Sequence, residues 1–374
     1  MDKTREKTKK KAVDFVLLIS IAMLVFMGII MVFSASWPVG MSRNNSPYYF
    51  LKRHILWVII GLIGMFLAMN FDYRKLKKIS PYVFLASLIL GALVFTPLGE
   101  SFKGGRRWLK LGSIVIMPSD TIKFGAILFF ARFLSAKRKD IKTFFQGTLP
   151  AIIIISFAVG VIIIEDLGTG GTLLLTMLAM FFVAGLNLVH AVPLGALGYA
   201  LINWAINDPK NKYRLARMEA YKDPFADRLG SGWQLTQSLY SLGSGGVLGL
   251  GLGKSRQKFF YLSEAYNDFI FAIIGEELGF VGSAIILLII FIVIWRGVTI
   301  ALNIEDSFGC FLATGITALI AVQSLVHIGV VTSTIPTTGI TLPFVSYGGT
   351  SLVMFMTLVG ILLNISRYIG VERR

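Results

Sequence analysis

Residues 268–295 read DFIFAIIGEELGFVGSAIILLIIFIVIW, an apolar stretch with a carboxylate at its first position and a pair of glutamates inside. A helix of this length is long enough to cross the hydrocarbon core of a bilayer. Small residues recur at helical spacing from the acid through Gly282, so a second helix can pack closely along that face. The stretch predicts a membrane-spanning helix with Asp268 at its mouth.

Asp268 has two interpretations at this point. A carboxylate at the entrance of a membrane helix is expensive to desolvate, which by default indicates a functional site. An acid in the same place also caps a helix N-terminus, where its charge interacts favourably with the helix dipole. The stretch alone does not separate the two interpretations, so the rest of the chain has to.

The composition of the whole chain indicates a membrane protein. Of its 374 residues 55% are hydrophobic, and the mean hydropathy of +0.74 is too high for a soluble globule of this size. The net charge of +16 comes from short basic runs beside apolar segments, which favours membrane orientation over nucleic-acid binding. The single cysteine, Cys310, excludes an intramolecular disulfide, and the three scattered histidines suggest no metal triad.

Ten apolar runs have the length of a membrane-spanning helix. We expect spans at residues 14–36, 54–71, 80–97, 115–135, 147–164, 169–187, 190–206, 268–295, 308–331 and 344–366. The predicted fold class is an all-α integral membrane protein in which residues 1–374 form a single polytopic domain. Its longest loop, residues 207–267, lies between the seventh and eighth helices.

Basic residues predict the orientation of these spans. An even number of spans places both ends on one side, and three basic clusters fall there: one before the first span, one after the second and one after the fourth. The positive-inside rule puts that side in the cytoplasm. We therefore expect residues 1–13 to form a basic cytoplasmic tail, both termini to be cytoplasmic and the 207–267 loop to be extracytoplasmic.

Four unusual segments fall on the predicted outer face, and the first is Gly104-Gly-Arg-Arg-Trp108. Guanidinium groups bind phosphate in a bidentate way, so Arg106 and Arg107 suit a phosphate-bearing lipid headgroup. Trp108, taken alone, favours the simpler role of an interfacial anchor.

The helix that follows this segment begins with Met117-Pro-Ser-Asp-Thr-Ile-Lys123. Pro118 fits the first position of a helix, with Asp120 in its first turn. Lys123 lies one turn deeper on nearly the same face, inside an apolar run. A lysine at this place predicts an intramembrane ion pair or an anion site.

The other three outer segments are a tight turn, the long loop and a broken helix. Glu165 and Asp166 sit in the turn, where helix capping and a site role are equally supported. The 207–267 loop mixes aromatics, arginines and glycines, which suits contact with a polar headgroup. Residues 336–349 contain prolines, glycines and hydroxyls near membrane depth, and irregular backbone there is tolerated only in a protein interior or along a polar cavity.

These motifs together resemble the SEDS family (shape, elongation, division and sporulation) of membrane proteins. The resemblance rests on Asn267-Asp-Phe-Ile-Phe-Ala272 with Gly275-Glu-Glu-Leu-Gly279, and on the Arg107-Trp108, 118–120, 166–169, 336–339 and 346–349 motifs. It covers essentially the whole chain. Residues 249–262 look closer to the FtsW and SpoVE branch than to RodA.

The resemblance implies a function and a partner. It implies a peptidoglycan glycosyltransferase in the bacterial cytoplasmic membrane that polymerises lipid II for cell division or sporulation. Such an enzyme contributes to cell wall biogenesis and cell shape. A class B penicillin-binding protein would supply transpeptidation. The absence of a Gly-x-x-x-x-Gly-Lys loop indicates no nucleotide cofactor.

The resemblance also implies site residues. Asp268 matches the essential aspartate of the family, and we assign it as general base; it is also the candidate ligand if a divalent cation (Mg²⁺ or Mn²⁺) takes part. The substrate-binding candidates are Arg106, Arg107, Trp108, Asp120, Lys123, Asp166, Ser346 and Tyr347.

Two other functions stay open. A lipid II flippase would need access from the cytoplasmic face too, whereas the unusual segments all lie on one side. A non-catalytic scaffold for a penicillin-binding protein would tolerate loss of Asp268.

The chain also departs from the family pattern at Met117, Asp120, Glu165, Ser263 and His327.

Overall fold

The computed structural model describes residues 11–102, 105–111, 114–187 and 212–370, with single positions at 189, 192, 195 and 198. Within these ranges the chain is mostly helical, and seven helices are long and apolar enough to cross a membrane. They are α1 (Phe15–Asn44), α2 (Tyr49–Asn70), α3 (Tyr73–Ala92), α5 (Leu149–Glu165), α10 (Ile270–Asn303), α11 (Ser307–Val331) and α12 (Gly349–Ser366). A 3₁₀ turn (Leu93–Phe95) extends α3, and a π-helical turn (Phe144–Thr148) precedes α5.

Two more helices of the bundle fall where spans were expected. α4 (Pro118–Ala136) carries three charged residues, and α6 (Leu167–Val183) has 17 residues, so neither is among the seven. α5 is as short as α6, but it is continuous with the π-helical turn, and Phe144–Ile163 together make 20 residues. The expected span at 190–206 lies almost wholly outside the described residues. The multi-pass character is therefore established, while the count of ten spans stays a prediction.

The expected all-α class is wrong in one place. Between Gly99 and Ile116, where mostly a loop was expected, the described residues form a small antiparallel sheet of β1 (Gly99–Phe102), β2 (Gly105–Leu111) and β3 (Ile114–Ile116), in the order β1-β2-β3. Aromatic and β-branched residues in short runs between glycines favour strands over helix here. The fold is mostly helical, with a strand insertion between α3 and α4.

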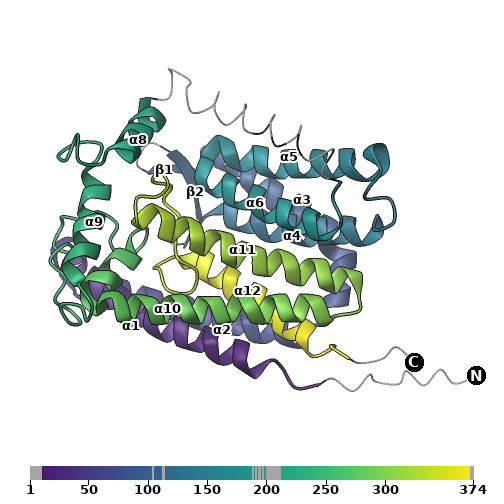
Figure 1. Ribbon diagram of the computed structural model, residues 1–374, viewed down its shortest axis with the longest axis horizontal. Helices are drawn as coiled ribbons and strands as arrows, with labels where there is room; N and C mark the ends of the chain where they lie inside the picture. The colour runs from purple at the N-terminus through teal and green to yellow at the C-terminus, as the bar shows by residue number, and fades with distance from the viewer. Residues whose placement is uncertain are drawn as a thin grey trace, which may run out of the picture.

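The two described ends of the chain lie together at one end of the bundle (Figure 1). The Lys11 N–H donates to the Arg367 carbonyl at 3.1 Å, and the Asp14 N–H donates to Ser366 Oγ at 3.1 Å. Arg296 Nε also donates to Asp14 Oδ2 at 2.9 Å, which ties the later part of α10 to the same point. Both helices α8 (Lys212–Lys222) and α9 (Trp233–Gly245) lie at the opposite end, together with the sheet.

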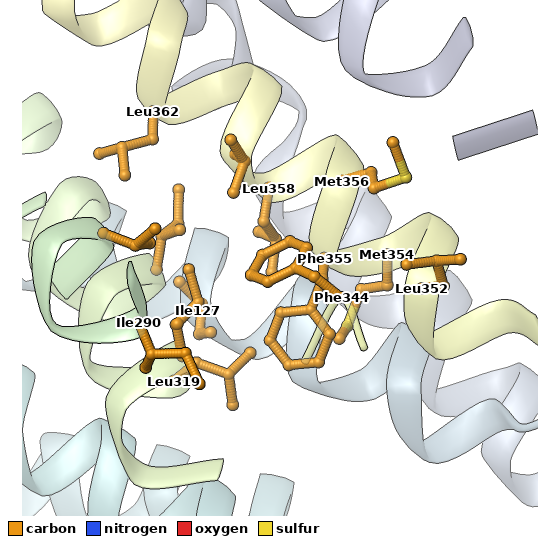
Figure 2. Close-up of a cluster of buried hydrophobic side chains, with 14 of the residues drawn as sticks. Ile127, Ile290, Leu319, Phe344, Leu352, Met354, Phe355, Met356, Leu358 and Leu362 are labelled. Carbon is orange, nitrogen blue, oxygen red and sulfur yellow. The ribbon is translucent and has the colours of Figure 1, made fainter. Parts of the chain in front are cut away.

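α12 is the central helix of the bundle. In its most apolar window 78% of the residues are buried, against 22% for α2. α2 packs along it, with Gly61 against Met356 and Gly64 against Thr357. Figure 2 shows the apolar side chains of α12, among them Phe355 and Leu358, converging with residues of α4, α10 and α11.

α10 is broken at Gly279, whose φ of 67° and ψ of −164° are not helical. Residues 246–251 dock on the break: the Leu250 N–H donates to the Glu276 carbonyl at 2.9 Å, and the Phe280 N–H donates to the Gly246 carbonyl at 2.9 Å. The predicted small-residue face accepts α9 at Gly275 and this loop at Gly279, so it does not hold one straight helix pair. The first nine residues of α10, 270–278, form a short helical segment directly after the turn that carries Asp268.

The close approach of α2 and α12 gives a testable expectation. A methyl group at Gly360 would collide with the Met65 carbonyl oxygen, so we expect Gly360→Ala to lower the free energy of unfolding by about 1–3 kcal/mol. Gly160→Ala on α5 is the control, because no atom lies within 4 Å of its added methyl group. Thermal unfolding in detergent compares the two, and equal melting temperatures would contradict the assigned packing.

Candidate functional site

Asp268 lies in a tight turn directly before α10. The Glu264 carbonyl accepts from three successive backbone N–H groups, those of Asn267, Asp268 and Phe269, at 3.0, 3.1 and 3.4 Å. Glu264 itself has a φ of 57°, a left-handed conformation that a residue other than glycine adopts at a cost of about 1–3 kcal/mol and that clusters at active sites. The cap position of α10 belongs to Phe269, so Asp268 is not the cap residue.

Residues 336–348 are irregular, where the sequence predicts irregular backbone over 336–349, and they hold the Asp268 turn from the side. Ser346 Oγ accepts from the Leu342 N–H at 2.8 Å and donates to the Asn267 carbonyl at 2.8 Å. The Tyr347 N–H donates to the Tyr266 carbonyl at 3.0 Å. Two predicted site residues, Ser346 and Tyr347, are therefore bonded to the residues immediately before Asp268.

Aromatic rings pack beside this turn. The Tyr347 ring lies 5.7 Å from that of Tyr266 and 5.6 Å from that of Phe50, measured between centroids. Burial raises the pKa of both tyrosines, so both phenols are neutral and able to donate at physiological pH. The turn is thus supported on one side by apolar rings with polar tips.

Asp120 and Lys123 form the intramembrane ion pair that their spacing predicts. Asp120 Oδ1 and Lys123 Nζ are 2.8 Å apart, with the side chains 3% and 4% exposed. Lys123 Nζ also donates to Gln323 Oε1 at 3.2 Å, and Thr350 Oγ1 donates to Asp120 Oδ2 at 3.3 Å. Gln323 Nε2 in turn donates to the Thr341 carbonyl at 3.1 Å, so the pair is bonded to the same 336–349 segment.

Asp166 and Arg217 reach the segment from two further elements. Asp166 is buried and caps α6, accepting from the Gly168 N–H at 3.0 Å and from Thr169 Oγ1 at 2.9 Å. Gly168 lies against Thr338, and Arg217 Nη1 of α8 donates to the Thr337 carbonyl at 2.8 Å. Capping is therefore the observed role of Asp166, in contact with the candidate site.

The strand β2 carries the remaining predicted residues. Trp108 is half-buried and pairs with Glu100 across the β1–β2 ladder. Arg106 and Arg107 belong to the same strand, and their side chains lie outside the described part of the structure. Their contact with a substrate stays a prediction.

Several buried polar atoms in and around this site have no hydrogen-bond partner among the described residues. They include Asn267 Oδ1, next to Asp268, and Thr338 Oγ1, next to Gly168. A buried polar atom without a partner is costly, so each is expected to bind water or a polar ligand.

The described residues offer no ready metal centre. No three His, Cys, Asp or Glu side chains of the described ranges converge on a point where they could hold an ion. A pocket of about 370 Å³ lies elsewhere, beside the Gly279 break, and apolar side chains of α1, α10 and the loop after α9 line most of it. Asp268 does not line that pocket, so we do not place the reaction there.

Sequence reasoning missed the residues that join these parts. Gln323 and Thr350 bind the Asp120–Lys123 pair, and Lys258 and Ser34 bind Glu277. Gln323 had a weak signal, a polar residue inside an apolar run. Nothing in the sequence pairs the others with their partners, because the elements that carry them come together only in the folded bundle.

Comparison with known proteins then decides the family. The family model described as "Cell cycle protein", named for FtsW, RodA and SpoVE, matches residues 15–370. The chain belongs to the FtsW, RodA and SpoVE family. The resemblance to SEDS proteins is thereby confirmed.

Two relatives illustrate the similarity. The chain is 45% identical over 364 residues to stage V sporulation protein E of Bacillus subtilis, covering 96% of this chain and 99% of that protein. It is 38% identical over 355 residues to the probable peptidoglycan glycosyltransferase FtsW of Trichlorobacter lovleyi, covering 94% and 93%. Both alignments run nearly end to end.

Solved structures show the same fold. A chain from a structure described as "Structural coordination of polymerization and crosslinking by a peptidoglycan synthase complex" matches with a TM-score of 0.76 at 26% identity, over 95% of this chain and 98% of that chain. The rod shape determining protein RodA of Thermus thermophilus matches with a TM-score of 0.70 at 26% identity, over 96% and 98%.

The buried Asp120–Lys123 pair predicts a large effect of removing one charge. We expect Lys123→Met to destabilise the protein by about 3–5 kcal/mol, because it leaves a buried carboxylate without its partner. The double variant Asp120→Asn/Lys123→Met should recover most of that loss. Lys110→Met breaks the pair with Glu100, which is about half exposed, and should cost at most about 1 kcal/mol.

Thermal unfolding of the four proteins in the same detergent measures these differences. A Lys123→Met variant as stable as Lys110→Met would show that the buried pair does not hold α4 in place.

Proposed function

We propose that this protein is a peptidoglycan glycosyltransferase that polymerises lipid II at the outer face of the cytoplasmic membrane. The observation that carries the proposal is the strained turn at residues 264–268, which Ser346 and Tyr347 fix and which presents Asp268 at the mouth of α10. The names of the FtsW relatives support the same activity, and that of the B. subtilis relative supports a role in sporulation.

In the proposed reaction Asp268 is the general base. The 4-hydroxyl of the acceptor sugar attacks the anomeric carbon of the donor as its proton passes to the Asp268 carboxylate. The bond from that carbon to the pyrophosphate oxygen breaks, and undecaprenyl pyrophosphate leaves with the electron pair. One such displacement inverts the anomeric centre, and a pyrophosphate leaving group needs little or no protonation, so one carboxylate is enough.

Positive charge near the leaving group would lower the barrier further. Arg107 is the candidate for the pyrophosphate oxygens because guanidinium binds phosphate in a bidentate way, with Arg106 and Trp108 on the same strand. Lys123 stays a candidate for substrate binding, and its buried pair with Asp120 gives it a second role in holding α4.

A divalent cation also stays part of the proposal. Mg²⁺ is often held by one or two carboxylates together with substrate phosphate oxygens, so Asp268 would bind it only with the lipid pyrophosphate in place. No step above depends on this ion.

Topology and partner follow from the same proposal. Both chain ends would be cytoplasmic, residues 1–13 would be a basic tail, and residues 207–267 would be extracytoplasmic in one polytopic domain. The similarity to a chain of a peptidoglycan synthase complex supports a penicillin-binding protein as partner for crosslinking.

Asp268→Asn tests the base. We expect the rate of glycan polymerisation from purified lipid II to fall by about 100-fold or more, because a positioned base contributes about 10²–10⁴-fold. Melting temperature should stay near that of the parent protein. Glu305→Gln, at an exposed acid of the opposite end, is the matched control and should be fully active.

The same gel assay, with and without the partner synthase, separates a polymerase from the two other functions. A flippase or scaffold would give no polymer in either case, and polymer formation by Asp268→Asn at the parent rate would remove Asp268 from the mechanism.

Arg107→Ala tests the phosphate contact. Loss of a charge-assisted hydrogen bond is worth about 1.5–3 kcal/mol, so we expect KM for lipid II to rise by about 10–100-fold. Arg228→Ala in the long loop, an exposed arginine, should leave KM unchanged. Equal KM values for the two variants would place the pyrophosphate elsewhere.

A further inference from the structure

Two neighbouring glutamates in α10 are fully buried, yet the proposed reaction does not use them. Glu276 and Glu277 both have 0% exposed surface. Glu277 Oε1 accepts from Lys258 Nζ at 2.8 Å, and the Lys258 side chain is also 0% exposed. Ser34 Oγ of α1 donates to Glu277 Oε2 at 2.6 Å, so the ion pair also contacts the first helix.

Glu276 binds the same loop beside this pair. Its Oε2 accepts from Ser255 Oγ at 2.6 Å and from Ser241 Oγ of α9 at 2.9 Å, and its Oε1 accepts from the Arg256 N–H at 2.8 Å. The Ser255 N–H donates in turn to Glu277 Oε1 at 3.2 Å. Residues 255–258 are therefore hydrogen-bonded to the segment of α10 that precedes the break at Gly279.

The ion pair closes a loop of the chain with Asp268 at its far end. Asp268 follows Lys258 by ten residues and precedes Glu277 by nine. The base of the loop is fixed by the buried pair, and its apex is fixed by the bonds from Ser346 and Tyr347. The Asp268 backbone is therefore held from one side by the buried pair through the short helix after Ile270, and from the other side by the bonds from Ser346 and Tyr347.

Stability alone is a weak reason for this pair. An apolar pair of similar volume stabilises a protein interior as well as a buried ion pair, or better, because no charge has to be desolvated. An ion pair with satisfied hydrogen bonds differs from an apolar contact because it fixes both the distance between the two groups and their relative orientation. That property matters where a neighbouring group has to be held within about 1 Å.

We propose that Lys258 and Glu277 are positioning residues, which hold the Asp268 carboxylate in register with the bound acceptor sugar. The inference rests on Asp268 acting as the base. Neither residue touches substrate in this scheme; both act through the geometry of residues 258–277.

Lys258→Met tests the proposal, with Lys254→Met as the matched control. Lys254 is a lysine of the same loop whose side chain is exposed. We expect Lys258→Met to lower kcat for lipid II polymerisation by about 100-fold while KM stays within a few-fold, because a misplacement of about 1 Å costs about that much in rate. Lys254→Met should keep both constants.

A second readout reports the geometry directly. Spin labels at Tyr261 and Phe280, which are 52% and 72% exposed, would be attached in a Cys310→Ser background. We expect a narrow distance distribution in the parent protein and in Lys254→Met, and a broadened one in Lys258→Met. A broadened distribution with parent kcat would overturn the proposal, as would unchanged kcat in folded Lys258→Met.

Glu277→Gln and Ser34→Ala keep the test decisive if Lys258→Met does not fold. Both keep nearly the same volume, and parent kcat in both folded variants would overturn the proposal. Asp268→Asn separates the proposed catalytic role of Asp268 from the proposed positioning role of Lys258. If Asp268→Asn is active, the proposed base is wrong, whatever the result for Lys258→Met. If it is inactive while Lys258→Met retains parent kcat, only the positioning role is wrong.

Discussion

The structure depends on satisfying the backbone of residues 336–348, which are irregular between two membrane helices. Lipid offers no hydrogen bonds, so such a segment persists only when protein groups bind its carbonyls and N–H groups. His327 Nδ1 donates to the Ile340 carbonyl at 2.7 Å, Gln323 Nε2 donates to that of Thr341, and Arg217 donates to that of Thr337. The same segment also holds the Asp268 turn. The hydrogen bonds that satisfy its backbone therefore also fix the position of Asp268.

The spans were predictable because their cause is local. Length and hydropathy decide which runs cross a bilayer, and the described helices fall where nine of the ten runs were expected. Boundaries were less accurate: α1 continues past Pro38 to Asn44, and α3 begins at Tyr73, capped by Asp72, among basic residues that hydropathy excludes. The β1–β3 sheet was missed, since it needs pairing between residues that look like a polar loop.

In the candidate site, too, local contacts were predictable from the sequence and long-range contacts were not. The Asp120–Lys123 pair has i,i+3 spacing on one helix, so the sequence alone predicts that the two side chains meet. The Lys258–Glu277 pair forms only because α10 breaks at Gly279 and accepts the loop beside it, and nothing local to Lys258 predicts this. The sequence shows Glu276 and Glu277 inside an apolar stretch, but it could not identify their partners.

The two described ends of the chain have a consequence for how the protein is made. Asp14, with a side chain only 4% exposed, binds Arg296, and its N–H donates to Ser366, which lies 352 residues further along the chain. A membrane protein is synthesised from its N-terminus, so α1 enters the bilayer long before either partner exists. The Asp14 carboxylate therefore lacks Arg296 until α10 is made, and the Asp14 N–H lacks Ser366 until α12 is made. Assembly of this bundle is therefore completed by the seam between first and last helices, and a truncated chain lacks that closure.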